Sequence, residues 1–460
     1  MFKKVLIANR GEIAVRIIRA CREIGIRAVA VYSTADRNSL HAQIADEAIC
    51  IGPAATKDSY LNMNAIIQAA LNVGADAIHP GFGFLSENAV FARRCEENGI
   101  TFIGPSYKSI EMLGDKAAAK ETMAAAGVPV IPGSKGAVSS LEEAKEVAAK
   151  AGYPVLVKAS AGGGGRGIRR ADSPEELESQ MIIAQQEAKN FFGDDSVYIE
   201  KLLINPHHVE IQIIADKHGN YIHLCERDCS MQRRNQKVLE ECPSPIVSPE
   251  LRKKMGNAAV TAAKQSGYYN AGTIEFLVDE NRDFYFMEMN TRIQVEHPIT
   301  EEVTGFDLVK AQIEIAAGLP LNVSQEDITL RGHAIECRIN AENPDLGFRP
   351  SPGTITALYM PGGPGIRIDG AVYQGYTITP YYDSMISKLI AHGSTREDAI
   401  NKMKWALAEF IVEGVDTNID FQLEILRQPE FRSGNYDNGF LNRYMEKKAI
   451  KRPQKGELNV

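Results

Sequence analysis

Residues 286–298 read FMEMNTRIQVEHP and place Glu288, Asn290, Arg292, Gln294 and Glu296 at alternate positions. Alternation with a period of two is typical of an extended strand, whose successive side chains point to opposite faces. One face of this stretch would therefore gather two carboxylates, two amides and a guanidinium. We interpret that face as a candidate site for a cation and an anion, with an ordinary solvated surface as the alternative.

The residues just before this stretch predict a β-hairpin. In TIEFLVDENRDFYFMEMN the loop is DENRDF, and pairing Val278 with Tyr285 puts Glu275 directly opposite Glu288. Like charges directly opposed in a sheet destabilise it, and a bound divalent cation removes that conflict. Magnesium takes oxygen ligands, and Asn290 offers an amide oxygen one step further along the same face. The hairpin predicts a metal site, against two solvated surface glutamates as the alternative.

The end of the stretch predicts an anion site, provided that the chain stays extended past residue 290. Arg292 offers a planar fork for an oxyanion, and Glu296 could serve as a general base beside it. The alternative is an exposed salt bridge between Arg292 and Glu296, which would contribute little to stability.

A glycine-rich loop is a second candidate site. The strand YPVLVKAS, which contains Lys158, runs into AGGGGRGIRR, where Gly162, Gly163, Gly164 and Gly165 are consecutive. Glycines let backbone N–H groups approach an anion closely. The lysine precedes the glycines and the chain returns as a strand, an order that differs from the P-loop. The loop predicts phosphate contact, with a flexible hairpin tip as the alternative.

Two further polar segments follow the glycine loop. HHVEIQII alternates, so that one face, wet or functional, carries His208, Glu210 and Gln212. RDCSMQRRNQK predicts a cationic patch that would suit phosphate or bicarbonate, formed by Arg227, Arg233, Arg234 and Lys237. A solvated face is the alternative for both segments.

Composition narrows the class of protein. The chain has 460 residues, a net charge of -8 and 44% hydrophobic residues, which indicates a globular protein of two to four domains. The acidic balance argues against a nucleic-acid partner, and no apolar run is long enough to span a membrane. Seven scattered cysteines predict reduced thiols in the cytoplasm. In HLCERDC, zinc binding by His223, Cys225 and Cys229 is less favoured than half-buried thiols on a strand, because a fourth ligand is missing.

The order of elements predicts several domains. From Lys3 short apolar runs alternate with helical stretches, which is typical of βαβ units and a mostly parallel sheet. The first turn, ANRGEIA, lacks the spaced glycines of a dinucleotide site. An alanine-rich helix begins near Asp115 and marks a boundary. A smaller α/β unit and a strand-rich segment follow, and strand periodicity restarts near Arg331 with Pro/Gly turns that indicate antiparallel structure.

Taken together, these motifs resemble the ATP-grasp fold, and nearly the whole chain resembles the biotin carboxylase family. The motifs are VLIANRGEIAVRIIRA, IHPGFGFLSEN, FIGP, KASAGGGGRG, ERDCSMQRRNQK, EMNTRIQVEHP, RGHAIECRINAE and PYYDSMISKLI. The resemblance implies an α/β and α+β multidomain fold. It divides the chain into a Rossmann-like N-terminal domain (1–113), an ATP-grasp domain (114–330) with a glycine-rich lid at about 131–203, a mostly antiparallel C-terminal domain (331–447) and a tail (448–460).

The resemblance also implies roles for individual residues. Nucleotide contacts would come from Lys116, Lys158, the lid glycines Gly162 to Gly165, Glu200, Lys201, Leu202, Leu203, His208, Asn235, Gln236 and Lys237, with the backbone of 200–203 holding adenine. Glu275, Glu288 and Asn290 match the family's ligands for Mg²⁺ or Mn²⁺. Bicarbonate would lie against Lys237, Arg292, Gln294, Val295 and Glu296, with Glu296 as the base, and Arg338 would stabilise the biotin enolate. Asn235 stands where some members carry histidine.

The implied reaction is carboxylation of biotin by ATP and bicarbonate through carboxyphosphate. We find no AMKM-like biotinylation motif, so the expected partners are a separate biotin carboxyl carrier protein and carboxyltransferase subunits, with the chain as a homodimer. The first hypothesis for the final acceptor is acetyl-CoA, for malonyl-CoA formation in fatty acid biosynthesis. The alternatives are the same half-reaction for pyruvate or propionyl-CoA carboxylase, and a different ATP-grasp ligase that joins a carboxylate to an amine.

Overall fold

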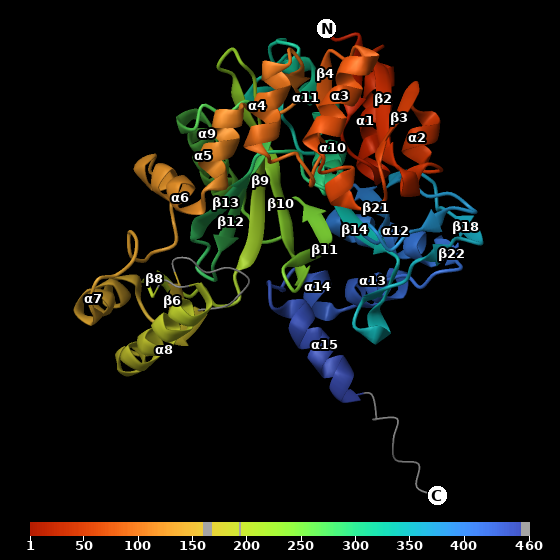
Figure 1. Ribbon diagram of the computed structural model, residues 1–460. Helices are drawn as coiled ribbons and strands as arrows, with labels where there is room; N and C mark the ends of the chain where they lie inside the picture. The colour runs from red at the N-terminus through yellow and green to blue at the C-terminus, as the bar shows by residue number, and fades with distance from the viewer. Residues whose placement is uncertain (160–167, 193–194, 452–460) are drawn as a thin grey trace, which may run out of the picture.

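The first hundred residues form a parallel sheet covered by helices, as the alternating pattern predicts. The computed structural model describes residues 1–159, 168–192 and 195–451. Five strands lie in the order β3-β2-β1-β4-β5 and pair in parallel. Their bounds are β1 Lys4–Ile7, β2 Arg27–Ser33, β3 Glu47–Gly52, β4 Ala77–His79 and β5 Thr101–Phe102. The helices are α1 Gly11–Glu23, α2 Leu40–Ile44, α3 Met63–Val73, α4 Ala89–Glu97 and α5 Tyr107–Gly114. Figure 1 shows this region at the top of the molecule.

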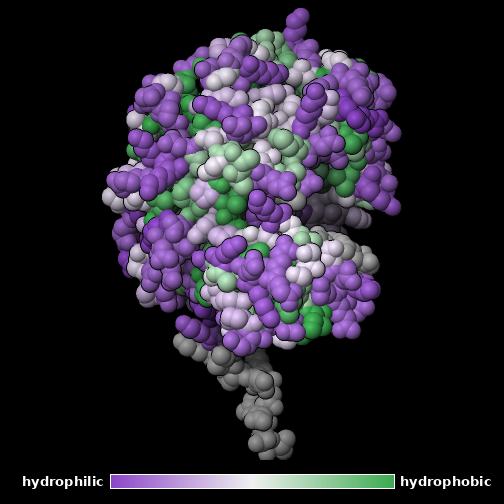
Figure 2. Space-filling view, turned by 90° about the vertical axis from the view of Figure 1, so that its left-hand side faces the viewer, coloured by the Kyte–Doolittle hydropathy of each residue, from purple (hydrophilic) through white to green (hydrophobic). Residues whose placement is uncertain are grey.

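A small antiparallel unit follows the boundary helix α6 (Lys116–Ala125). Its three strands lie in the order β7-β6-β8, with bounds β6 Val155–Ala159, β7 Ile168–Ala171 and β8 Val197–Lys201. Helices α7 (Leu141–Ala151) and α8 (Pro174–Phe192) pack against it through buried alanine, valine and leucine side chains. The unit projects from one side of the molecule (Figure 1). The face that includes this unit is mostly hydrophilic, and its apolar residues are scattered (Figure 2).

One eight-stranded sheet joins the central and C-terminal regions, in the order β13-β12-β9-β10-β11-β14-β21-β19. The strands are β9 His207–Ala215, β10 Tyr221–Arg233, β11 Gln236–Cys242, β12 Asn270–Val278, β13 Phe284–Asn290, β14 His333–Asn340, β19 Ile366–Gly370 and β21 Met385–Gly393. The sequence predicts an antiparallel segment that restarts near Arg331. In the structure that segment extends the existing sheet, because β14 pairs antiparallel with β11.

Helices and short strands complete the central and C-terminal regions. The helices are α9 Pro249–Gln265, α10 His297–Thr304, α11 Leu308–Ala316, α12 Arg396–Glu409, α13 Ile419–Leu426, α14 Pro429–Ser433 and α15 Phe440–Lys451. The short strands are β15 Glu342–Asn343, β16 Arg349–Pro350, β17 Gly353–Thr354, β18 Ala357–Tyr359, β20 Thr377–Ile378 and β22 Ile411–Glu413. Helix α15 continues past residue 448, where the tail was expected to begin. Within the described ranges, no helix combines the length and apolar character needed to cross a membrane.

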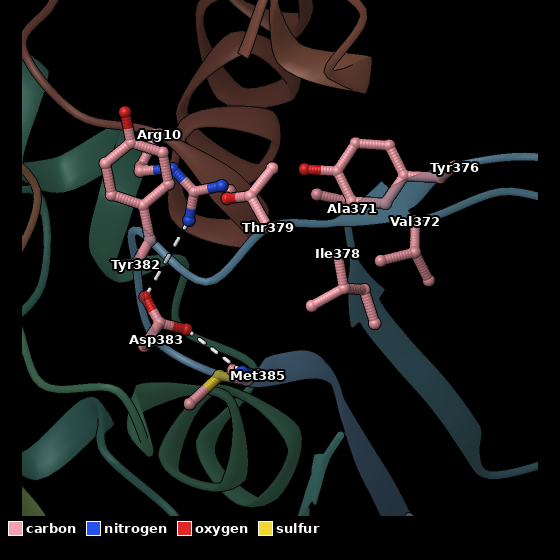
Figure 3. A pocket seen from close by; sticks show the side chains of 10 residues that line it. Arg10, Ala371, Val372, Tyr376, Ile378, Thr379, Tyr382, Asp383 and Met385 are labelled. Carbon is pink, nitrogen blue, oxygen red and sulfur yellow. Dashed lines mark hydrogen bonds and ion pairs between the residues drawn. The ribbon is translucent and has the colours of Figure 1, made fainter. Parts of the chain in front are cut away.

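The N-terminal and C-terminal regions contact each other directly. The guanidinium of Arg10 lies 4.2 Å from the centre of the Tyr382 ring, and its Nη1 atom lies 3.8 Å from a carboxylate oxygen of Asp383 (Figure 3). Arg10 also pairs with the buried Asp36 at 2.7 Å. A separate apolar cluster joins Ile13 and Ile17 of α1 to Ile293 in the loop after β13. The apolar cluster fixes the N-terminal region against the loop that carries the candidate anion site, and the contacts of Arg10 with Tyr382 and Asp383 tie it to the C-terminal region.

The hairpin differs from its predicted register by one residue. Val278 pairs with Phe284, not with Tyr285, but a β-bulge between Glu275 and Phe276 restores the predicted pairing of Glu275 with Glu288. In a bulge one strand carries an extra residue, so Phe286 and Glu288 lie on opposite faces although they are two positions apart. The core side of the sheet therefore receives Phe286, and the other side receives Glu288.

The extended stretch ends earlier than predicted. Strand β13 stops at Asn290, and residues 291–296 form bends and a turn before α10 begins at His297. The alternation of Arg292, Gln294 and Glu296 is therefore not the alternation of a strand. These side chains reach the site from a loop.

Candidate active site

Lys237 is the centre of a buried acidic cluster. Its Nζ atom donates to Glu210 Oε2 at 2.6 Å, to Glu275 Oε1 at 3.0 Å and to Glu296 Oε1 at 2.6 Å. An ammonium group has three N–H donors, so each donor has one carboxylate. The four residues come from β9, β11, β12 and the loop after β13. Three strands of the large sheet and one loop thus bring together charged groups that lie far apart in the sequence.

Glu296 is held by two cations. Its Oε2 atom accepts from Arg338 Nη2 at 2.9 Å, and its Oε1 atom accepts from Lys237. Burial alone would raise the pKa of Glu296, but the charges of Lys237, Arg338 and Arg227 hold that pKa well below its usual range. Glu296 is therefore ionised at neutral pH. Loss of its contact with either cation would make Glu296 a stronger base.

The alternative of a salt bridge between Arg292 and Glu296 is wrong, because each residue has other partners. Arg292 donates from Nε to Glu87 Oε2 at 2.8 Å and from Nη1 to Gln294 Oε1 at 2.9 Å. Its Nη2 atom donates to Asn290 Oδ1 at 3.0 Å. The guanidinium is thus held at the end of β13, and Glu87 reaches it from the N-terminal region.

Glu275 and Glu288 are paired across the hairpin, as predicted, but the amide oxygen of Asn290 faces Arg292 and not Glu275. Glu275 lies opposite Glu288 in the register, and its Oε1 atom accepts from Asn290 Nδ2 at 2.9 Å. His208 Nε2 lies 3.0 Å from Glu275 Oε2. Burial would raise the pKa of Glu275, but Lys237 and His208 lower it, so the carboxylate is charged. Two opposed carboxylates fit the ligand preference of magnesium, and the oxygen of Asn290 would serve as a third ligand only after exchanging its contact with Arg292.

The strand β9 and the arginine-rich segment are more deeply buried than predicted. His208, Glu210 and Gln212 share a face, but all three are buried, as are Val209 and Ile211 on the other face. The predicted cationic patch is not one surface, because its members point in different directions. Arg227 is fully buried against Glu210, Arg233 lies over the Phe348 ring, and Arg234 is exposed in a turn.

A two-residue turn, formed by Arg234 and Asn235, joins β10 to β11, and Gln236 is the first residue of β11. Arg234 and Asn235 have φ angles of 50° and 63°, and Arg233 pairs with Gln236. Positive φ at both central positions is the type I′ hairpin geometry, which favours asparagine. The tip is exposed and adjoins Lys237.

A second charged group lies on the small antiparallel unit. Glu200 Oε1 accepts from Lys120 Nζ at 2.8 Å, and Glu200 Oε2 accepts from Lys158 Nζ. Burial would raise the pKa of Glu200, but Lys158 and Lys120 lower it. The backbone N–H of Lys201 donates to Pro132 and that of Leu202 to Pro154, so these two N–H groups are already engaged. The side chain of Lys116 and the glycines 162–165 lie outside the described residues.

Several residues of the site were not predicted: Glu87, Lys120, Arg227 as a buried ion, Glu240 and Lys388. Arg338 Nε donates to Glu240 Oε1 at 2.6 Å. Lys120 could have been found, because it follows Lys116 by four positions and thus shares its helix face. The pairing of Arg292 with Glu87 has no sequence signal, since the two residues are 205 positions apart.

In the described part of the chain, His223, Cys225 and Cys229 do not form a metal cluster with one another. Cys225 and Cys229 are fully buried, not half-buried as predicted. Cys225 Sγ donates to Glu226 Oε2 at 3.1 Å, and Cys229 Sγ lies 3.7 Å from Glu296 Oε1. Among the described residues, two clusters of three His, Cys or Glu side chains have ligand atoms close enough to share a metal: His208, Glu210 and Glu275, and Glu210, Cys229 and Glu296. The segment's His223 is in neither group among the described residues.

The class of protein that these features indicate is an ATP-grasp ligase: a parallel α/β region is joined to an antiparallel sheet, and lysines and carboxylates converge on that sheet. Three family descriptions match in order: the N-terminal domain of biotin carboxylase (residues 1–110), the ATP-binding domain of the carbamoyl-phosphate synthase L chain (115–324) and the C-terminal domain of biotin carboxylase (336–443). The chain belongs to the biotin carboxylase family and is an ATP-dependent ligase that carries out the biotin carboxylation half-reaction.

The relatives differ in the carboxylase that they serve. Biotin carboxylase 1 of Bacillus subtilis is 59% identical over 445 residues, which cover 96% of this chain and 99% of the relative. A pyruvate carboxylase subunit of Methanothermobacter thermautotrophicus is 56% identical, covering 96% and 90%. The biotin carboxylase domain dimer of the Hydrogenobacter thermophilus 2-oxoglutarate carboxylase, solved with MgADP, ADP and bicarbonate, is 54% identical with a TM-score of 0.87, covering 97% and 98%.

Proposed function

We propose that this chain supplies the biotin carboxylase activity of an acetyl-CoA carboxylase. The observation that carries the half-reaction is the convergence of Lys237, Glu296 and Arg338 beside the opposed pair Glu275 and Glu288. The acetyl-CoA assignment is the first hypothesis for the acceptor, and the relatives leave it open, because the Bacillus subtilis biotin carboxylase is 59% identical and the pyruvate carboxylase subunit 56%. Because that margin is small and another polypeptide selects the acceptor, pyruvate carboxylase is the second candidate.

We assign the nucleotide to side chains and backbone groups of the small antiparallel unit and the large sheet. The contacting groups would be Lys116, Lys158, Gly162 to Gly165, Glu200 to Leu203, His208, Asn235, Gln236 and Lys237. Glu275, Glu288 and Asn290 would hold magnesium, which supplies positive charge to the phosphate groups. The described contacts support this, because Lys158 and Lys237 are both held by carboxylates that a phosphate could replace.

The bicarbonate and biotin roles follow from the charges of the loop after β13. Arg292, Gln294 and Val295 would hold bicarbonate, and Glu296 would remove its proton as the anion attacks the γ-phosphorus. Lys237 would stabilise the negative charge that develops on the phosphate oxygens. Arg338, which is positive and already within reach of Glu296, would stabilise the biotin enolate.

We also propose the assembly in which the enzyme works. Domain boundaries near residues 113 and 330 are supported by the gaps between the matched family segments. A homodimer is supported by the 2-oxoglutarate carboxylase relative, which is a dimer. Separate carrier and carboxyltransferase chains are the expected partners, and a cytoplasmic location agrees with the free cysteines in the described residues.

The activity is tested with the purified chain and free biotin. ADP release should require bicarbonate and should rise when biotin is added. ADP release that requires an amine and does not respond to biotin would support the carboxylate–amine ligase instead. The acceptor is tested by isolating the enzyme with its native partners: an acetyl-CoA-specific transferase would support the first proposal, and a pyruvate-specific one the second.

A further inference from the structure

Lys388 is a fully buried lysine beside the candidate anion site. It lies on β21, with 0% of its surface exposed, directly opposite Arg338 on β14 and Asp369 on β19. Residues directly opposite each other in neighbouring strands share a face of the sheet. Lys388 and Arg338 therefore point to the same side, toward the loop that carries Glu296.

The ammonium group of Lys388 has two close partners from two other regions. Its Nζ atom donates to the backbone carbonyl of Val295 at 2.7 Å and lies 3.1 Å from Glu12 Oε2. Glu12 belongs to the first turn of α1, and Val295 to the loop after β13. A buried lysine is costly unless its charge is paired and its donors are used. Here one donor contacts the peptide that links two expected bicarbonate residues.

The preceding peptide, between Gln294 and Val295, is also held by a hydrogen bond to its carbonyl oxygen. The carbonyl of Gln294 accepts from His297 Nδ1 at 2.8 Å. Burial, followed by the charges of Lys388, Arg16 and Arg367, lowers the pKa of His297, so its imidazole is neutral and carries the Nδ1 proton. In a trans peptide the carbonyl and the N–H point in opposite directions. The N–H groups of Val295 and Glu296 therefore point away from His297 and Lys388.

We infer that Lys388 is a positioning residue for bicarbonate, because it turns the Val295 carbonyl away from the anion and thereby fixes the orientation of the peptide N–H groups. A carbonyl oxygen turned toward bicarbonate would repel it, whereas a preorganised N–H attracts it. Arg338 fixes the side chain of Glu296 from the same sheet face, and Lys388 fixes the backbone before it. This inference rests on the proposed bicarbonate site.

The experiment compares Lys388→Met with the matched control Lys402→Met. Lys402 also donates to a backbone carbonyl, that of His392 at 3.0 Å, and pairs with Asp398, but it lies on α12 away from the site. In Lys388→Met the bicarbonate KM should rise at least about tenfold, as expected for losing a hydrogen bond from a charged donor. The ATP KM should change less than about twofold, because the nucleotide contacts are untouched. Lys402→Met should change neither constant.

Two more variants distinguish a loss of bicarbonate binding from a loss of folding. Lys388→Met combined with Glu12→Gln removes the carboxylate left without a partner, and it should show the same rise in bicarbonate KM. Lys388→Arg keeps a cation and a donor, and it should raise that KM less than Lys388→Met. An unchanged bicarbonate KM in folded variants, with only a lower melting temperature, would overturn the inference. Failure of the unmodified chain to release ADP in response to bicarbonate would instead overturn the proposed function.

Discussion

Arg227 illustrates how a single buried ion organises the site. Its side chain is fully buried and donates to Glu210 Oε1 at 2.5 Å, to Gln212 Oε1 at 2.8 Å and to Thr300 Oγ1 at 2.9 Å. Glu210 in turn accepts from Lys237. Arg227 thus supports the lysine at the centre of the acidic cluster without reaching the solvent-accessible part of the site.

We predict that Arg227→Met is strongly destabilising. Removing one partner of a buried ion pair leaves an uncompensated charge, at a cost of about 3–5 kcal/mol. The control Arg234→Met removes an exposed arginine nearby and should change stability by about 0.5 kcal/mol or less. Urea unfolding followed by fluorescence measures both. Adding Glu210→Gln to Arg227→Met should restore part of the loss, and equal midpoints for Arg227→Met and the control would contradict this account.

At the scale of the element, the β12–β13 hairpin sets the two carboxylates against each other. The turn at 279–283 is tied by Asp279, whose Oδ1 atom accepts from the N–H groups of Asn281 and Asp283, both at 2.9 Å. The bulge then places Glu288 opposite Glu275. The turn and the bulge together place the two proposed metal ligands opposite each other.

We predict that Glu288→Gln weakens the use of magnesium-ATP more than it weakens the fold. Replacing one charged oxygen ligand should raise the KM for magnesium-ATP at least about tenfold. The melting temperature should change little, because Glu288 is only half-buried. Glu280→Gln, in the exposed turn of the same hairpin, is the matched control and should behave as the unmodified chain. Full activity of Glu288→Gln at low magnesium would disprove the metal assignment.

Sequence periodicity predicts the two strands of the hairpin well, but it does not predict where a strand bulges or ends. The alternation in 273–290 predicts both strands and the pairing of Glu275 with Glu288. It cannot predict the bulge, because one extra residue in a strand leaves no compositional mark. The end of β13 at Asn290 also cannot be predicted from the sequence, because the alternation of polar residues continues through the loop. The partners Glu87 and Lys388 depend on tertiary packing, which local patterns do not encode.

At the scale of the whole molecule, charged side chains join the three regions around the loop 291–296. Arg16 of α1 pairs with Glu301 at 3.0 Å and Asp307 at 2.7 Å, and Arg367 of β19 pairs with Glu301 at 2.9 Å. Glu301 lies on α10, directly after the loop. The loop is thus flanked by ion pairs from both the N-terminal and the C-terminal regions. Its shape depends on the assembly of the entire chain.

The junction between the central and C-terminal parts of the large sheet has its own buried ion. Glu241 on β11 is fully buried, and its Oε2 atom lies 2.6 Å from both His333 Nε2 and Arg396 Nε. Its Oε1 atom accepts from Tyr436 OH at 2.5 Å. Burial would raise the pKa of Glu241, but the hydrogen bonds from His333 and Arg396 lower it to about 2.

The lowered pKa of Glu241 predicts how acid changes the stability of the folded protein. The folded-state pKa lies below the unfolded value of about 4.3, so the stabilisation is complete above that value and is lost as the pH falls toward 2. A shift of this size corresponds to about 3 kcal/mol. Glu241→Gln should therefore lower stability at pH 7 and should show a shallower decline between pH 5 and 3, measured by urea unfolding at each pH. The control Glu397→Gln removes an exposed ion pair with Arg432, which contributes little, and should keep the slope of the unmodified chain. Parallel acid profiles for the unmodified chain and Glu241→Gln would show that this carboxylate does not couple the sheet junction to pH.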